Sequence, residues 1–253
     1  MNVTVYKLDA SRGSIKLQTF CLIVRSFGFR WAWSDTCCID KENNVVLQES
    51  LVAMFAWYRG SSLTIVHLLG VSSLSEEPNG LRDSIWNSRV WTYQEYVAAK
   101  RVLFYTEDWK PYHGLTLANH KESPIILKEM EVSQVSAVIL RPGLDRAREK
   151  LYLASTRETT LVEDIAYSLL GILNASIPVI YGEGTRAVGR LLEYVLTGSG
   201  DATILAWTGT ANEYNSCLPM HLTVYNPLVP PHIPHMATTE LDRLVTELRT
   251  SLT

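Results

Sequence analysis

The sequence lacks the features that mark membrane-spanning, secreted and general nucleic-acid-binding proteins. No apolar run reaches the roughly 18 to 20 residues that a membrane-spanning helix needs, and the start of the chain has no basic segment followed by an apolar core and a cleavage site. The formal net charge is −3, and no Lys/Arg run provides a footprint that neutralises phosphates. We therefore expect a soluble, cytoplasmic protein that spans no membrane and binds no nucleic acid.

Cysteine is scarce, and its placement gives no disulfide framework. Among the 4 cysteines, Cys37 and Cys38 are adjacent, whereas Cys21 and Cys217 are isolated. This spacing fits reduced thiols in a reducing compartment, and we expect them to be mostly buried. A buried strand would raise the pKa of Cys37 and Cys38 and block access to them, which argues against a reactive thiol.

The composition is that of a globular protein with a sizeable core. The chain has 253 residues, of which 47% are hydrophobic and 19% charged, enough for one full domain plus an appendage. We place the domain at residues 1–207, with a helical C-terminal part at about 155–200. Residues 208–253 form a proline-rich tail, expected to be loosely attached, with a possible terminal helix at 238–252.

Helical and strand-like apolar patterns alternate along the chain. The helical patterns lie at residues 14–26, 47–58, around 91–95, at 160–173 behind a capping-box spacing, and from 185 to about 198. Short runs of strand character lie at residues 29–40, 63–69, 101–105, 124–127 and 201–207. This alternation predicts an α/β fold, a doubly wound, mainly parallel sheet with additional helices.

The most informative stretch is RVWTYQE at residues 89–95. One helical turn places Trp91 and Glu95 on the same face. Packing alone explains such a pair if Trp91 is in the core and Glu95 is solvated. An aromatic wall beside a partly desolvated carboxylate also suits a ribose or nicotinamide ring and a developing positive charge. On spacing alone, the packing interpretation leads.

Several ordered motifs together resemble a known family, the fungal heterokaryon-incompatibility (HET) domain in the form common in mushroom-forming fungi. The motifs are WSDTCCID at 33–40, ESLVAMFAWY at 49–58, RVWTYQE at 89–95, and EDIAYSLLG at 163–171 followed by YGEG at 181–184. The resemblance covers roughly residues 10–207. It implies a role in programmed cell death after fusion of genetically different cells, and a distant likeness to the flavodoxin-like TIR fold.

The resemblance also implies an activity. Several TIR domains cleave the nicotinamide–ribose bond of NAD with a glutamate in a Trp-x-x-x-Glu context, which is similar to Trp91 and Glu95. By this resemblance Glu95 is the catalytic residue, with Trp91, Arg89 and Asp40 as substrate-binding residues and NAD as substrate. No cofactor or metal is implied, and the expected protein partner is a second copy or another incompatibility protein.

Each of these side chains has a chemical rationale and an alternative. A carboxylate at Glu95 would stabilise the oxocarbenium character that develops on the ribose. Trp91 could stack on a ring or pack in the core, and Arg89 could meet a pyrophosphate or pair at the surface. Asp40 would follow a strand, at the edge where doubly wound sheets bind ligands. Asp35, at odd spacing from Asp40, would point to the opposite face and have a structural role.

One departure from the family pattern leaves a second function open. Family members begin with an additional strand, whereas residues 2–8 are similar to the segment after it. Residues 3–8 would then replace the missing strand. If they do not, the chain is a non-catalytic TIR-like oligomerisation or signalling module, or an inactive truncated paralogue.

Three other patterns are interpreted as structural or coincidental. Cys217 and His221, followed by His232 and His235, have the residue types of a zinc site, but they lie in the tail outside the resemblance, so we expect no metal. The YGEG sequence lacks the remaining positions of a phosphate-binding loop and predicts a tight turn. His67, inside an apolar run, is interpreted as a core histidine.

Overall fold

The computed structural model describes residues 5–9, 11–73, 80–130 and 142–226, together with Thr239 and Arg243. Two strands are present in these ranges, β1 (Thr64–His67) and β2 (Val102–Tyr105). The α-helices are α1 (Arg12–Ser26), α2 (Asp35–Cys38), α3 (Asn44–Gly60), α4 (Ile85–Ser88), α5 (Val90–Ala98), α6 (Pro124–Glu129), α7 (Ala147–Ser155), α8 (Asp164–Tyr167), α9 (Leu170–Leu173) and α10 (Arg186–Ser199). Short 3₁₀ helices are η1 (Val5–Lys7), η2 (Tyr112–Gly114), η3 (His120–Glu122), η5 (Ala202–Leu205) and η6 (Leu222–Tyr225).

The two strands pair in parallel, with Thr64 opposite Val102 and His67 opposite Tyr105. The chain passes between them through α4 and α5, as a parallel pair requires a crossover connection. The predicted strands at 63–69 and 101–105, the helix between them and their parallel direction are therefore confirmed. The fold is α/β, and in the described ranges its sheet consists of β1 and β2.

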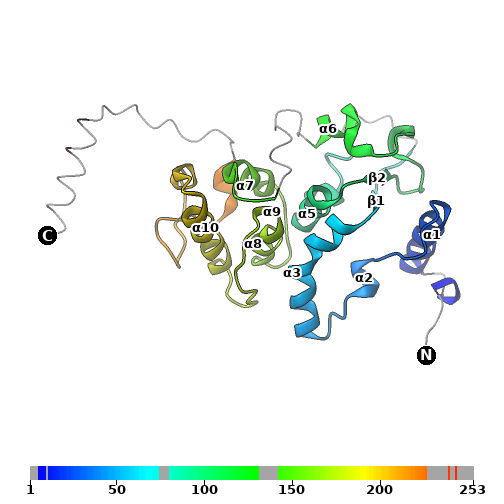
Figure 1. The fold of residues 1–253 in the computed structure, drawn as a ribbon, viewed down its shortest axis with the longest axis horizontal. Helices are drawn as coiled ribbons and strands as arrows, with labels where there is room; N and C mark the ends of the chain where they lie inside the picture. Colours follow the sequence, from blue (N-terminus) through cyan, green and yellow to red (C-terminus); the bar gives the residue numbers. More distant parts are fainter. Residues whose placement is uncertain are drawn as a thin grey trace.

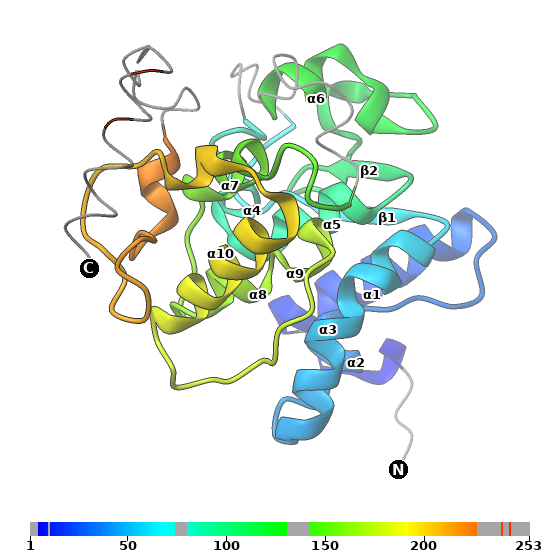
Figure 2. The ribbon, with the colours of Figure 1, turned by 60° about the vertical axis from the view of Figure 1, so that its left-hand side comes forward.

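Two hydrophobic clusters form the core, and α5 contributes to both. Tyr93 and Val97 of α5 pack in a cluster with α3 and helices α7 to α10. Tyr96 packs in a second cluster with β1, β2 and α6. Figure 1 shows this arrangement, with α3 and α5 between the C-terminal helices on one side and the strands and α1 on the other, and Figure 2 shows α5 again between β1 and α9. A helix apolar on several faces fits this central position.

Three long helices begin where the sequence predicts helices. The Ser11 hydroxyl caps α1 by accepting the Ser14 backbone N–H at 3.3 Å. The Asn43 side chain caps α3 by accepting the N–H groups of Val45 and Val46. Such caps satisfy backbone donors that a helix start leaves free. The predicted helix after residue 184 is α10, whose inward-facing side chains are fully buried and whose end is followed by Gly200 at φ 65°.

Three predicted strands are wrong. Residues 35–38, inside the run predicted as a strand at 29–40, form the single-turn helix α2. Residues 124–127 belong to α6, because Pro124 occupies the first turn of a helix, where its missing N–H costs nothing. Residues 201–207 include η5, because the Asp201 carboxylate accepts the Thr203 backbone N–H at 2.9 Å and starts a helical turn.

The single helix predicted at 160–173 is also wrong, because the chain forms two short helices, α8 and α9, there. The capping box does not form: Glu163 instead accepts the backbone N–H groups of Gly182 and Gly184, each at 2.9 Å. This contact explains the YGEG turn, and the interpretation of that sequence as a tight turn is confirmed. Helix α7 had no strong sequence signal. The strand suggested for residues 3–8 is not formed at Val5–Lys7, which is 3₁₀-helical.

The first part of the predicted tail packs against the domain. Leu218, Leu222 and Tyr225 are fully buried in the cluster that contains α7 and α10. The Tyr225 hydroxyl donates a hydrogen bond to the Ile204 carbonyl at 2.9 Å. Loose attachment is therefore wrong for residues 208–226. The predicted terminal helix at 238–252 lies almost entirely outside the described residues.

Candidate functional site

The candidate site is centred on Glu95, in the middle of α5. Its side chain is half-buried, and the Trp86 indole N–H donates a hydrogen bond to its Oε2 at 3.3 Å. Trp86 belongs to α4, which is tied to α5 by Thr92, whose hydroxyl lies 2.6 Å from the Trp86 carbonyl and 2.7 Å from the Arg89 carbonyl. The short α4–α5 junction therefore aims an indole N–H at the carboxylate nine positions further along the chain.

Burial controls the charge of Glu95. The pKa of this carboxyl is raised from 4.5 to about 7, mainly by desolvation and to a smaller extent by the charge of Asp35. The Trp86 hydrogen bond and the cations Arg89 and Arg157 act in the opposite direction. The side chain is consequently poised between its neutral and charged forms near neutral pH, a property that is enriched at functional sites.

Tyr58 of α3 and Asp35 of α2 also interact with Glu95. Burial raises the pKa of the Tyr58 hydroxyl on α3 well above its ordinary value, and the carboxylates of Glu95 and Asp35 add to this effect. Asp35 is exposed at the start of α2. The Trp33 ring packs edge-on against Tyr58, with ring centroids 5.6 Å apart. The Tyr58 phenol on α3 and the Glu95 carboxyl on α5 therefore lie together, and the charge of Asp35 on α2 acts on both.

Arg157 fixes the turn that leads into α5. Its guanidinium donates to the carbonyls of Asn87 and Arg89 at 2.7 and 3.1 Å, to the Asn87 side-chain oxygen at 2.8 Å, and to the Thr92 hydroxyl at 3.0 Å. It also lies over the Tyr93 ring, 5.2 Å from the centroid. Burial lowers the pKa of Arg157 to about 10, so the group remains a cation at neutral pH. The guanidinium thus orders the junction and places positive charge near Glu95.

The structure brings some predicted site residues together and separates another. Arg89 is exposed next to α5, and its charge acts on Glu95. Trp91 is half-buried and packs against the cluster of C-terminal helices. Asp40 is exposed and accepts the Glu42 backbone N–H at 3.1 Å, and no contact among the described residues links it to Glu95. Asp35, interpreted from the sequence as structural, is the carboxylate that acts on Glu95.

Sequence reasoning missed Trp86, Tyr58 and Arg157. Each lies far along the chain from the Glu95 motif or at a spacing that matches no helical or strand period. Tyr58 is the last residue of the ESLVAMFAWY motif, and its place in that motif was the only sequence signal that pointed to it. Arg157 had none, because its role depends on the position of α7, which the sequence did not reveal.

The cysteines are more accessible than the sequence suggests. Cys37, Cys38 and Cys217 are exposed and Cys21 is half-buried, all as free thiols. The expectation of mostly buried cysteines is wrong because residues 35–38 form a surface turn of helix rather than a buried strand. Burial still raises the pKa of Cys37, with its Sγ 3.9 Å from that of Cys38.

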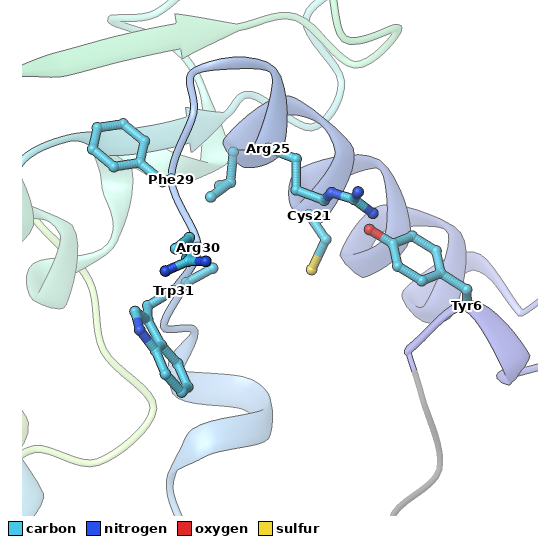
Figure 3. Close-up of a pocket in the computed structure, with 8 residues that line it drawn as sticks. Tyr6, Cys21, Arg25, Phe29, Arg30 and Trp31 are labelled. Atoms are coloured by element: carbon cyan, nitrogen blue, oxygen red, sulfur yellow. The ribbon is translucent and has the colours of Figure 1, made fainter.

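A separate hollow lies between α1 and the segment that follows it. Its volume is about 290 Å³, and its lining includes Cys21 and Arg25 of α1 together with Arg30 and Trp31 (Figure 3). Glu95 does not line it. Of the suggested zinc ligands, Cys217 and His221 are exposed, and His232 and His235 lie outside the described residues. Within the described ranges no group of three or more His, Cys, Asp or Glu side chains could hold a metal ion.

The end of β1 holds His67 differently from a core histidine. Its ring is half-buried and stacks on Trp109 with centroids 4.2 Å apart, while its Nε2 lies 3.1 Å from the Glu107 carbonyl oxygen. Glu107 also accepts the Gly70 N–H and pairs with Arg12 of α1 at 2.6 Å. These contacts fasten α1 to the loops at the carboxyl ends of the strands.

Comparison with known proteins gives an informative match. The vegetative incompatibility protein HET-E-1 of Podospora anserina is 33% identical over 179 residues, which cover 66% of this chain and 13% of that protein. The chain is therefore related to a vegetative incompatibility protein and corresponds to a small part of its length. No protein-family profile matches the chain, and no solved structure matches it. Among the described residues, no helix is both long and apolar enough to cross a membrane.

Proposed function

We propose that this chain acts in heterokaryon-incompatibility-type programmed cell death by hydrolysing the nicotinamide–ribose bond of NAD, with Glu95 as the essential residue. Two observations support the proposal. The first is the similarity to a vegetative incompatibility protein. The second, which carries the assignment of chemistry, is the desolvated Glu95 carboxyl, whose pKa is raised to about 7 and which lies beside a phenol and an indole, with the charge of Asp35 acting on it.

The reaction breaks the C–N bond between the ribose and nicotinamide and forms a C–O bond to water. Nicotinamide leaves with the bonding electron pair as a neutral molecule, so it needs no protonation. Positive charge builds on the ribose carbon, and the ionised Glu95 carboxylate stabilises that charge more than it stabilises the substrate. The attacking water releases its proton to Glu95 and then to solvent.

The surrounding residues have roles in the same proposal. Arg89, an exposed cation whose charge acts on Glu95, binds the pyrophosphate. Trp91 walls the nicotinamide side of the site, and Asp40 contacts the substrate from the segment after α2. The parallel β1–α5–β2 unit is the unit from which doubly wound sheets are built, and we extend the proposal to a TIR-like sheet in a cytoplasmic protein.

The direct test is nicotinamide release from NAD by the purified protein at high concentration. We expect release by the wild type and loss of at least about 100-fold in Glu95→Gln, which keeps the shape of the side chain but cannot carry the negative charge. Glu49→Gln, an exposed position on α3, is the matched control and should retain activity. Equal activity in the wild type and Glu95→Gln would show that Glu95 is misassigned.

A second candidate function is a non-catalytic oligomerisation or signalling module. It is favoured by exposed apolar side chains on the N-terminal elements, including Trp31 at 91% and Leu22 at 56% exposure, because large exposed apolar areas mark interaction surfaces. Its partner would be another copy or another incompatibility protein. Absence of nicotinamide release from folded, self-associated wild type would sink the NAD hydrolase proposal in favour of this one.

A further inference from the structure

On the side of β1 that faces away from β2, backbone groups have no hydrogen-bond partner among the described residues. The Thr64 N–H donates to the Arg101 carbonyl at 2.9 Å, and the Leu68 N–H donates to the Tyr105 carbonyl at 2.8 Å. Residues of a parallel strand direct their backbone groups alternately to its two sides. The N–H and C=O groups of Ile65 and His67 therefore point away from β2, and no described residue hydrogen bonds to them.

At the opposite edge of the sheet, the outward N–H groups of β2 do have hydrogen-bond partners. The outward N–H groups of Val102 and Phe104 in β2 donate to the Asn119 side-chain oxygen and to His120 Nδ1, each at 3.0 Å. The next N–H, of Thr106, donates to the Lys110 carbonyl at 2.9 Å. The chain thus covers the β2 edge with its own groups, whereas no described residue pairs with the outer edge of β1.

The β1 edge carries neither the charges nor the prolines that commonly prevent strand pairing. Residues 61–71 (SSLTIVHLLGV) contain no charged residue and no proline, although charges and prolines commonly blunt exposed edges. Leu69, just beyond the strand, is 41% exposed. An uncharged, unpaired edge flanked by an exposed leucine is a template for a further strand.

We propose that β1 pairs with β1 of a second copy of this chain, in antiparallel orientation about a two-fold axis at Val66. Ile65 then lies opposite His67 of the second copy, and His67 lies opposite its Ile65. In a hydrogen-bonded antiparallel pair each residue uses both its N–H and its C=O, so the free groups of both copies are all satisfied.

The unpaired groups favour a second copy as the occupant. Donors and acceptors two residues apart are self-complementary under a two-fold axis, and the absence of charge in this segment avoids repulsion between identical strands. The two-stranded sheet becomes four-stranded, which is more stable than an isolated pair. This proposal is independent of NAD hydrolysis and would hold for an inactive chain.

The test combines mass with amide hydrogen exchange. Light scattering of the purified chain from dilute solution to about 1 mM should show a monomer becoming a dimer. Over the same range, exchange of the Ile65 and His67 amides should slow by at least about tenfold, whereas the amides of Thr64, Leu68 and Val102 should be protected throughout. No substitution is needed for this measurement, so it does not depend on a variant that folds.

Two variants test the geometry. Ile65→Pro removes an N–H that points away from β2, a position where an edge strand accepts proline, and should keep the chain monomeric at about 1 mM. Ile65→Val keeps the N–H and should dimerise like the wild type. Three results would overturn the proposal: a monomer at every concentration, a dimer in which the two amides exchange as in the monomer, or two amides already protected in the dilute monomer.

Discussion

At the scale of single residues, the burial of Glu95 makes the stability of the folded protein depend on pH. Burial raises its pKa from 4.5 to about 7, so the folded protein holds the proton more tightly than the unfolded chain does. Between these two pH values the folded state binds more protons, and stability falls as pH rises. The stabilising contribution of the neutral carboxyl is present below about pH 4.5 and is lost as pH rises through about 7.

Glu95→Gln should remove this pH dependence, because the amide is neutral at every pH and its oxygen can still accept the Trp86 N–H. We predict that the variant gains about 1–3 kcal/mol in free energy of unfolding relative to the wild type at pH 8, and that the difference shrinks towards zero near pH 4.5. Urea unfolding at the two pH values measures this change. The exposed variant Glu49→Gln is the control, and a Glu95→Gln difference of equal size at both pH values would contradict the prediction.

The local conformation of residues 35–38 explains why Asp35, and not Asp40, acts on Glu95. The sequence predicts a strand at 29–40, in which alternate side chains point to opposite faces. Residues 35–38 instead form one helical turn, and Asp35 acts electrostatically on both Glu95 and Tyr58. The local conformation decides which carboxylate participates, and a short stretch with both apolar and polar residues does not specify that conformation.

At the scale of elements, helices α3 and α9 are in close contact at a glycine. A methyl group added at Gly171 would overlap the Cβ and Cγ atoms of Phe55, which is itself buried. A backbone approach this close needs a residue without a side chain. Gly171 is the last residue of the EDIAYSLLG motif, and the close packing of α9 against α3 explains why a glycine occupies this position.

We predict that Gly171→Ala destabilises the protein by about 1–3 kcal/mol or more, since neither Phe55 nor the backbone can yield freely in a packed core. Gly13→Ala in α1 is the matched control. Nothing lies within 4 Å of the added methyl there, and alanine is favoured over glycine inside a helix by about 0.5–1 kcal/mol. The midpoint temperature of thermal unfolding should therefore be lower for Gly171→Ala and slightly higher for Gly13→Ala than for the wild type. A Gly171→Ala protein as stable as the wild type would mean that α3 and α9 are not packed this closely.

Elements with long, regular apolar patterns were predictable from the sequence. Helix α10 repeats apolar residues at helical spacing over 14 residues and ends before Gly200, and the run at 63–69 is short, apolar and β-branched. The failures are short elements. Residues 124–127 contain two isoleucines and a leucine, which suit a strand. They form a helix instead, which begins at Pro124 and buries Ile126 and, four positions later, Met130. In such stretches tertiary packing decides between the two conformations.

At the scale of the whole molecule, α5 joins the two clusters of the core through side chains on different faces. The same helix carries Glu95 between them. Motif order along the chain indicated this region, but the convergence of Asp35, Tyr58 and Trp86 on Glu95 depends on how α2, α3 and α4 pack around α5. That packing brings together residues that interact over 9 to 60 positions of sequence, which no local pattern encodes.

The folded unit extends beyond the domain boundary that the sequence predicts at residue 207. Residues beyond it are part of the core: Leu218, Leu222 and Tyr225 are fully buried against α7 and its neighbours. Prolines and a lack of periodicity suggest a loose tail, but short turns such as η6 can bury side chains without any regular pattern. A boundary after residue 226 keeps all these contacts.

We predict that Leu222→Ala lowers the free energy of unfolding by about 2–5 kcal/mol, as expected for a fully buried leucine. Its exposed neighbour offers the control, because Thr223→Ala removes no core contact. Truncation after residue 207 should cost more than Leu222→Ala, since it opens the whole cluster surface under η6 to water, whereas truncation after residue 226 should leave that surface covered. Urea unfolding of the four proteins ranks these effects. Equal stability of the two truncated chains would restore the boundary at 207 and would mean that residues 208–226 cover a core that is already complete.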